Sequence, residues 1–483
     1  MALSSQIKRL ARHSAIYGLG GIVSRILAVF LLPLYTRYLK PSDYGAIETL
    51  LALSAVLVTV LRLGISSAFF RFYFDAADDA ARTLVVRTSF WFTMVSATAG
   101  LAAGVALASP ISHLLFGTGD RAGLVRAAFV GLWAQMNYEQ LTSLFRVEER
   151  SVSFVLATLA NLVVTVAATV VLVVGFHHRA LGVVVGNFTG TLAVWAVLLG
   201  YRRFQLGLQF DRSLFRQMNR FGVPLVPSAL ALWATNFSDR FFLVKFANVR
   251  EVGLYSIGVR VASAIVLLLT AFRTAWPAFA YSIREDNEAR RTYGFVLTYV
   301  TFFSSWAALA LGLAAPWIVR LLTTPDFYAG SRVVSPLAFS AVIFGAYIVV
   351  VTSIGRAGRR GSNWIVTGAA ALLNVVLNII LIPPYGMMGA AVSTVVAYAA
   401  MFAGIAWKAQ RVFPVDYQWR RVGLTAGAAV GLTVVGKVLD VGLPVAVALT
   451  LAYPFVLALV GFYLPQERAR IGAFGKRLLP GRV

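Results

Sequence analysis

The chain of 483 residues contains no cysteine, only four histidines and few acidic residues. The absence of cysteine excludes disulfides, thiolate metal sites and cysteine nucleophiles. Charged residues make up 13% of the chain, which is about half the share of a soluble domain. By contrast, 59% of the residues are hydrophobic, and the mean hydropathy is +0.78. Because no polar stretch is long enough to form a soluble domain, the composition predicts one integral membrane unit.

Acidic residues are scarce relative to basic ones, with 19 Asp and Glu against 43 Lys and Arg, and the formal net charge is +24. Nucleic-acid binding does not explain this excess, because no soluble segment carries a basic patch with interleaved aromatic residues. A surplus of Lys and Arg in cytoplasmic loops does explain it. We therefore expect anionic membrane lipids as partners, and no nucleic acid.

Long hydrophobic runs make up most of the chain. At about 20 apolar residues per membrane crossing, they predict about fourteen transmembrane helices. The first run follows Lys8, Arg9 and Arg12 as in a signal peptide. It is too long for a signal peptide and lacks a clean cleavage site, so we expect a retained helix. The expected spans are 15–39, 43–63, 84–108, 124–143, 154–174, 180–199, 223–246, 252–272, 293–319, 333–354, 363–382, 386–407, 422–439 and 443–464.

Basic residues alternate between the loops that these spans define. With the amino terminus inside, the inner segments hold roughly thirty Lys and Arg and the outer segments roughly ten. The distribution predicts that both termini are cytoplasmic. Residues 201–222, with five arginines among aromatic and aliphatic residues, are expected to be an amphipathic interfacial linker.

An internal repeat is visible at an offset of 207 to 210 residues. Gly45 corresponds to Gly253, Arg146 to Arg356, and Gly182 to Gly389. Two six-helix halves starting on the same side imply a parallel repeat about an axis along the membrane normal, with substrate bound between the halves. The predicted parts are an amino-terminal lobe (1–200), the linker (201–222), a carboxy-terminal lobe (223–412), two further helices (413–464) and a basic cytoplasmic tail (465–483).

Four arginines interrupt the apolar spans: Arg25, Arg240, Arg260 and Arg273. A charge at mid-bilayer costs roughly 2.5 to 3.5 kcal/mol on insertion scales, so such residues usually face a polar cavity or a partner. Arg25 has no acid three or four positions away, so no local ion pair neutralises it. The arginines predict a central cavity that binds an anion, because a guanidinium matches phosphate oxygens.

Some of these arginines can be interpreted in two ways, because acidic residues are expected near them. Asp239 and Arg260 are expected at similar depths, where they either form a structural pair or serve the substrate. In the first case Arg240 would stay unpaired or extend towards the interface, and Arg273 is expected to reach the inner interface. Glu48 and Glu139 are candidates for ion coupling by protons or Na⁺, or for structural pairing with a basic residue.

Asn374 and Asn378, one helical turn apart, are expected to line the cavity or to bond between helices. We predict no catalytic residue, cofactor or metal site in this chain. His177 and His178 fit a solvated turn better than a metal site.

Several short segments resemble those of the Wzx-type polysaccharide flippases of the multidrug/oligosaccharidyl-lipid/polysaccharide exporter superfamily, and together they extend over nearly the whole chain. The resemblance implies a flippase of the bacterial inner membrane that moves a polyprenyl-pyrophosphate-linked oligosaccharide to the outer leaflet by alternating access. It also implies that cavity arginines meet the pyrophosphate, and that polysaccharide-assembly proteins are candidate partners. The segments are Ser24-Arg25, 32–39 with 43–45, 224–228 with 238–240, 252–258, 272–277 and 382–386 with 389–391.

Two other functions would leave different residues. A drug or cation exporter of the same superfamily needs an acidic or aromatic cavity, against which the arginines argue. A membrane glycosyltransferase or polymerase needs acidic groups in sizeable outer loops. The predicted outer loops are short, and Asp75, Asp78 and Asp79 fall on the inner side.

Overall fold

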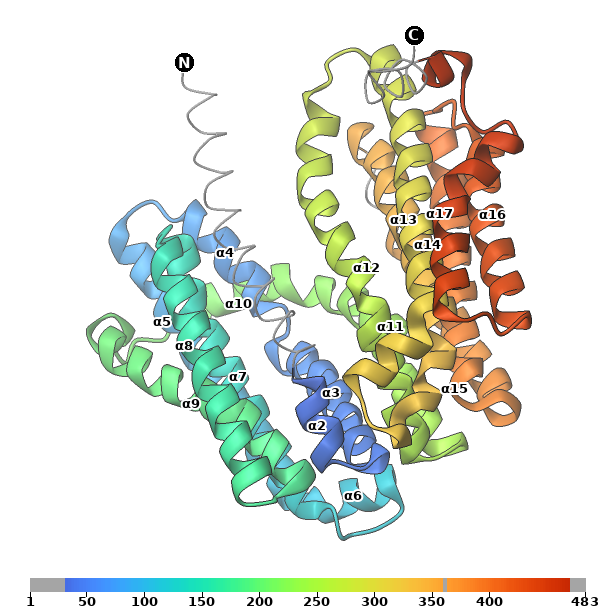
Figure 1. Ribbon diagram of the computed structural model, residues 1–483. Helices are drawn as coiled ribbons and strands as arrows, with labels where there is room; N and C mark the ends of the chain where they lie inside the picture. Colours follow the sequence, from blue (N-terminus) through green and yellow to red (C-terminus); the bar gives the residue numbers. More distant parts are fainter. Residues whose placement is uncertain (1–30, 359–362, 470–483) are drawn as a thin grey trace, which may run out of the picture. The chain divides into compact units, whose positions relative to one another are not determined.

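The computed structural model describes residues 31–358 and 363–469, and within these ranges every regular element is a helix (Figure 1). The chain divides into two compact units. The first unit comprises Met1–Ser256, Leu322–Tyr328 and Ala371–Ala390, and the second comprises Ile257–Leu321, Ala329–Ala370 and Ala391–Val483.

The helices follow one another with short connections, as Figure 1 shows. The first ten are α2 (Leu32–Tyr38), α3 (Pro41–Arg62), α4 (Ile65–Asp75), α5 (Asp79–Ala106), α6 (Ala108–Phe116), α7 (Ala122–Val147), α8 (Ser151–Val170), α9 (Arg179–Leu206), α10 (Arg212–Gly222) and α11 (Val226–Phe246). The others are α12 (Val249–Ser282), α13 (Asp286–Leu322), α14 (Val334–Arg356), α15 (Asn363–Val412), α16 (Trp419–Val438) and α17 (Leu443–Leu459).

In the described part of the chain, nine helical stretches are long and apolar enough to cross a membrane. The helices α7 and α11 have comparable length but contain more polar residues. The chain is therefore an all-helical, multi-pass membrane protein. Every predicted span from residue 43 onward overlaps a helix, whereas most of the first span lies outside the described residues. The number fourteen stays a prediction.

Three short helices, α4, α6 and α10, were not predicted as separate helices from the sequence. A turn at Gly64, with φ of 73°, separates α3 from α4, and α6 follows directly on α5. The segment 201–222, predicted to be an amphipathic linker, comprises the end of α9 followed by α10. Met218 of α10 is fully buried, while its arginines are exposed. Apolar periodicity locates long crossings well but gives little signal for helices of one to three turns.

The break predicted between residues 382 and 386 is confirmed inside α15. Pro383 and Pro384 lack backbone N–H donors, and Gly386 has φ of 54° and ψ of −133°, so regular helix cannot continue there. The carboxylate of Glu251 accepts a hydrogen bond from the N–H of Met387, at 3.1 Å. An acid from α12 thus caps the second half of α15, where the helix dipole favours negative charge.

Two glycines allow the starts of α3 and α12 to touch. A Cβ atom on Gly45 would lie 1.9 Å from the carbonyl oxygen of Val249, and one on Gly253 would lie 2.0 Å from that of Pro41. Both pairs exchange under the same shift of 208 residues, since 249 − 41 and 253 − 45 both equal 208. Such reciprocal contacts are what a two-fold axis between the two segments would produce.

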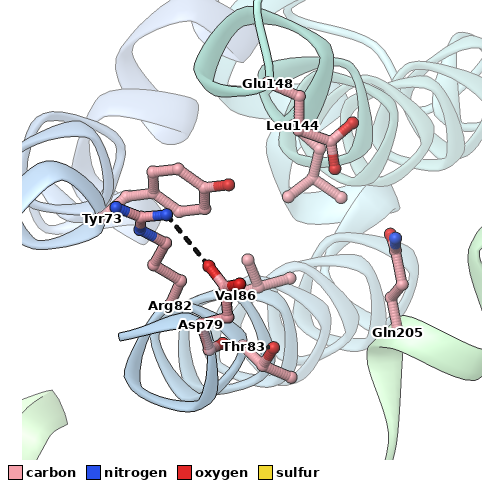
Figure 2. Close-up of a pocket in the computed structure, with 8 residues that line it drawn as sticks. All are labelled: Tyr73, Asp79, Arg82, Thr83, Val86, Leu144, Glu148 and Gln205. Carbon is pink, nitrogen blue, oxygen red and sulfur yellow. Dashed lines mark hydrogen bonds and ion pairs between the residues drawn. The ribbon is translucent and has the colours of Figure 1, made fainter. Parts of the chain in front are cut away.

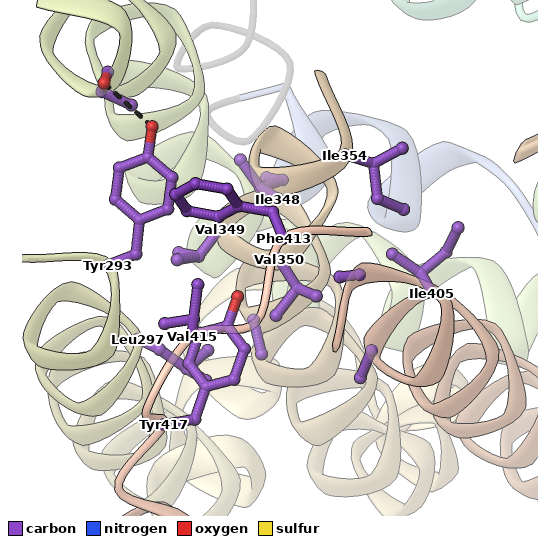
Figure 3. Packing of buried hydrophobic residues seen from close by; sticks show 14 of the residues in the cluster. Tyr293, Leu297, Ile348, Val349, Val350, Ile354, Ile405, Phe413, Val415 and Tyr417 are labelled. Carbon is purple, nitrogen blue, oxygen red and sulfur yellow. Dashed lines mark hydrogen bonds between the residues drawn. The ribbon is translucent and has the colours of Figure 1, made fainter. Parts of the chain in front are cut away.

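Aromatic and aliphatic side chains form the cores of each unit. In the first unit, Phe69, Phe90 and Leu141 belong to a cluster built from α4, α5, α7, α8, α9 and α10. In the second unit, Tyr293 and Phe413 lie in the cluster of Figure 3, with ring centroids 6.2 Å apart. The Tyr293 hydroxyl donates to the carbonyl oxygen of Ala280, at 2.8 Å. These contacts join α12, α13 and the segment after α15.

An ionic network ties the segment after α17 to the second unit. Arg421, only 7% exposed, lies 2.7 Å from Glu467, which also accepts hydrogen bonds from the Tyr299 hydroxyl at 2.6 Å and the Leu464 N–H at 2.9 Å. Burial acts to raise the pKa of Glu467, but the hydrogen bonds and the charge of Arg421 outweigh it and hold this pKa below the ordinary 4.5.

We expect this network to weaken in acid. A carboxylate with a depressed pKa stabilises the fold fully above its unfolded pKa, and the contribution is lost as the pH falls below about 4.5 and through the folded pKa. The Glu467→Gln variant should therefore have a lower melting temperature than the parent protein at pH 7, and the difference should shrink as the pH falls from 5 to 3. A difference that is constant across this range would contradict the assignment.

Candidate functional site

A buried ion pair lies where α11 meets the beginning of α12 in the first unit. Arg240 Nη1 is 2.8 Å from Asp239 Oδ1, and Asp239 Oδ2 accepts a hydrogen bond from the Tyr255 hydroxyl. Arg240 Nη1 also donates to the carbonyl oxygen of Asn236, at 2.8 Å. Asp239 and Arg240 are each 4% exposed. The pair is thus a desolvated dipole held by hydrogen bonds on several sides.

The expectation that Arg240 would be unpaired or extend to the interface is wrong. Neighbouring positions on a helix do not face each other, but the long arginine stem folds back onto Asp239. The charge of Glu48, on α3, also acts favourably on Arg240. The contact with Asp239 therefore reduces the positive potential that Arg240 offers to an anion.

The remaining arginines of the apolar spans differ in their surroundings. Arg25 lies outside the described residues. Arg260 is half-buried on α12, and its pairing with Asp239 stays a prediction. Arg273 is exposed on the same helix. None of these three arginines has an acid three or four positions away in the sequence.

Deeply buried arginines in the described part of the chain share one property, which is an acidic partner. Taking a lone charge out of water is so costly that a buried guanidinium needs such a partner. Those that are 2%, 4% and 7% exposed are paired as Arg202 with Glu148, Arg240 with Asp239, and Arg421 with Glu467.

Glu139 has a structural partner in Arg62, at the end of α3. Arg62 Nη1 lies 2.6 Å from Glu139 Oε2, and Arg62 Nη2 donates to the carbonyl oxygen of Met136. The Gln135 side chain donates to the other carboxylate oxygen, at 2.9 Å. The Glu139 side chain is 35% exposed, so water can still reach it. The pairing anticipated for Glu139 is thus present, and its role in ion coupling stays a proposal.

Asn374 and Asn378 are buried together on α15. Asn378 Nδ2 donates to Asn374 Oδ1 at 3.2 Å, and the two residues are 1% and 0% exposed. Across the described residues, Asn374 Nδ2 and Asn378 Oδ1 find no hydrogen-bond partner. A buried amide donor and acceptor left unsatisfied cost free energy. This pair therefore retains one donor and one acceptor for a polar group.

A polar cavity that the sequence did not reveal lies in the first unit, among α4, α5, α7 and α9 (Figure 2). Its volume is about 190 Å³, and Asp79 and Arg82 form an ion pair of 3.0 Å at its edge. Burial and the charge of Glu148 raise the pKa of the Tyr73 hydroxyl above its usual 10.0. In the sequence, the basic residues near this cavity indicated only which loops are cytoplasmic. Among the described residues, no cluster of His, Asp and Glu could hold a metal ion.

Two known proteins are similar to this chain in sequence. A protein of the Lsg locus of Haemophilus influenzae is 23% identical over 293 residues, covering 58% of this chain and 68% of its own. An uncharacterized membrane protein of Methanocaldococcus jannaschii is 22% identical over 205 residues, covering 41% of this chain. The aligned part spans 40% of the archaeal protein's length.

Solved structures share the fold at low sequence identity. The lipid II flippase MurJ, in an inward closed conformation, has a TM-score of 0.75 and 14% identity, covering 92% of this chain and 99% of its own. An inward-facing multidrug resistance MATE family transporter of the MOP superfamily has a TM-score of 0.66 and 15% identity, covering 84% and 98%.

A family model described as polysaccharide biosynthesis protein matches residues 34–330, which is more than half of the chain. This match includes α3, the buried ion pair of α11 and the capping acid of α12. The chain therefore belongs to the polysaccharide biosynthesis protein family and has the fold of the MOP-superfamily transporters.

Proposed function

We propose that this protein is a flippase that moves a polyprenyl-pyrophosphate-linked oligosaccharide, the repeat unit of a polysaccharide, from the inner to the outer leaflet of a bacterial cytoplasmic membrane. The observation that carries the proposal is the union, in one chain, of a polysaccharide biosynthesis family match and a fold shared with a lipid II flippase. Both termini are proposed to be cytoplasmic, in line with the basic loops. A flippase binds and releases its cargo without covalent chemistry.

The physical task is to carry a charged, hydrated headgroup through an apolar layer. A pyrophosphate cannot leave water without new hydrogen-bond donors, which a central cavity supplies by alternating access. Arg25, Arg240 and Arg260 are proposed to meet the pyrophosphate. Asn374 and Asn378, which keep a donor and an acceptor in reserve, are proposed to bond with sugar hydroxyls.

These arginines differ in how far acidic residues offset their positive charge. Arg240 is already offset by Asp239 and by the charge of Glu48. Arg25 has no acid within one helical turn in the sequence, so we propose that its charge meets the anionic ligand. Glu48, Glu139 and Asp239 are the proposed sites of coupling to protons or Na⁺. Polysaccharide-assembly proteins are proposed partners at the membrane.

The Arg25→Ala variant should lose glycan transport. Removing a charge-assisted contact of about 1.5 to 3 kcal/mol should slow transport roughly ten- to hundredfold. The measurement is the translocation of a short-chain, fluorescent polyprenyl-pyrophosphate oligosaccharide in proteoliposomes, together with glycan export in cells that depend on this gene.

The matched control is Arg273→Ala, which removes an exposed arginine from α12 and should retain transport. Arg25→Lys keeps the charge but not the bidentate geometry, so its rate should fall between those of the parent and Arg25→Ala. Normal abundance of each variant is checked in the same membranes. Full transport by Arg25→Ala would refute the assigned role. Efflux of organic cations, with no movement of the lipid-linked glycan, would favour the drug exporter instead.

A further inference from the structure

An apolar groove of about 480 Å³ runs between α8 and α9 in the first unit. Small residues of α8, including Ser153, Ala157 and Ala160, form one wall, and Val194 and Val197 of α9 form the other. Val197 is 70% exposed, so the described residues leave the groove open. A trough of this kind between two long helices has room for one hydrocarbon chain.

The length of the groove matches one leaflet. Its α8 wall extends from Ser153 to Val164, which at 1.5 Å per residue is roughly 16 Å. Half of a hydrocarbon core of about 30 Å is nearly the same distance. The end near Ser153 lies beside the α7–α8 connection, which the charge distribution predicts to be cytoplasmic.

Positive charge gathers at that end. Residues 146–150 and 202–203 contain four arginines and two glutamates, a net formal charge of 4 − 2 = +2. Glu148 makes its two short contacts, of 2.6 and 2.7 Å, with the buried Arg202. The Arg150 side chain is 53% exposed and lies 3.5 Å from Glu148, a weaker contact. Arg203 is also exposed.

A side chain of the groove connects this charge to the apolar trough. Tyr201 lines the groove, is 63% exposed, and its hydroxyl lies 3.4 Å from Arg150 Nη1. An aromatic ring with a polar tip suits the boundary between lipid chains and headgroups. A cation, an amphipathic ring and a leaflet-deep trough therefore follow one another along α8 and α9.

We propose that this groove is a binding site for an anionic glycerophospholipid of the cytoplasmic leaflet. One acyl chain lies between α8 and α9, and the phosphate lies against Arg150 and Arg203. A phospholipid suits the site better than a polyprenyl carrier because the groove spans a single leaflet, whereas a long polyprenyl chain exceeds it. The proposed site uses none of the arginines assigned to the transported pyrophosphate, and it goes beyond the flippase function.

Native mass spectrometry of the full-length protein, titrated with phosphatidylglycerol or phosphatidylcholine in detergent, tests the site. The parent protein should retain one phosphatidylglycerol more tightly than phosphatidylcholine. Loss of the charged contacts in the Arg150→Gln/Arg203→Gln variant should weaken phosphatidylglycerol binding about tenfold or more and leave phosphatidylcholine nearly unchanged. Ala160→Trp, which fills the trough, should weaken both lipids.

Matched controls separate the site from general effects of the substitutions. Arg126→Gln removes an exposed arginine from the opposite end of α7, and Ala102→Trp enlarges an exposed alanine on α5 outside the groove. Both should bind phosphatidylglycerol as the parent does. Unchanged binding in the double arginine variant and in Ala160→Trp would overturn the proposal. Tighter retention of polyprenyl phosphate than of phosphatidylglycerol, lost in the same variants, would overturn the choice of occupant.

Discussion

Replacing Asp239 by alanine should lower the free energy of unfolding by about 3 to 5 kcal/mol, because it leaves a buried arginine without the carboxylate that contacts it. Arg240 is 4% exposed, so water cannot replace the lost carboxylate without opening the structure. The Tyr255 hydroxyl loses its acceptor in the same step. Thermal unfolding followed in detergent should therefore show a clearly lower midpoint, and the yield of folded protein should fall.

A double variant separates the structural role of the pair from a role in transport. In Asp239→Asn/Arg240→Met the charges are removed together, and an amide oxygen remains to accept from Tyr255. Because removing both members of a buried pair is often nearly neutral, the melting midpoint should return close to that of the parent protein. Recovery of stability with transport still lost would assign these charges to the substrate or to ion coupling.

Recovery of both stability and transport would make the pair structural, and the pyrophosphate would then depend on the other arginines. The double-variant cycle also measures the coupling directly, because the two residues are in contact and their single effects should not add. Equal losses from Asp239→Ala in the parent and in an Arg240→Met background would contradict the pairing itself.

The crossings were predictable because a bilayer allows only long apolar helices, and their length is set by its thickness. The break after Ile382 was predictable for a similarly local reason, since two successive prolines and a glycine cannot continue a helix. Basic residues were harder to place. In the sequence Arg202 is one of several arginines near a connection, yet it is 2% exposed and bound to Glu148, 54 positions away.

Which acidic residue pairs with which basic residue depends on packing in three dimensions, and the hydropathy of the sequence carries no information about it. The sequence offered Arg260 as the partner of Asp239 on the grounds of equal depth and did not indicate that Arg240, the next residue on the same helix, contacts it as well. Short helices such as α4 and α6 were not predicted for another reason. They depend on single turns, such as the one at Gly64, rather than on a sustained apolar period.

Replacing either Gly45 or Gly253 by alanine should destabilise the protein by about 1 to 3 kcal/mol or more, because the added methyl meets a backbone oxygen that no side-chain rotation can remove. The built Cβ atoms lie 1.9 and 2.0 Å from those oxygens, far inside contact distance. The starts of α3 and α12 must therefore move apart. Melting midpoints of the purified variants should fall by similar amounts, since the two contacts are reciprocal.

The control is Gly427→Ala, at a helical glycine of α16 whose Cβ would meet nothing within 4 Å. Removing glycine from a helix interior there should raise the stability by up to about 1 kcal/mol. An unchanged or higher midpoint in Gly45→Ala would mean that the close approach of α3 and α12 is absent in the protein. The two contacts share one gap, so Gly45→Ala/Gly253→Ala should cost clearly less than the sum of the single variants. Once one methyl has separated the segments, the other meets an oxygen that has already moved, and strict additivity would show that the two contacts are independent.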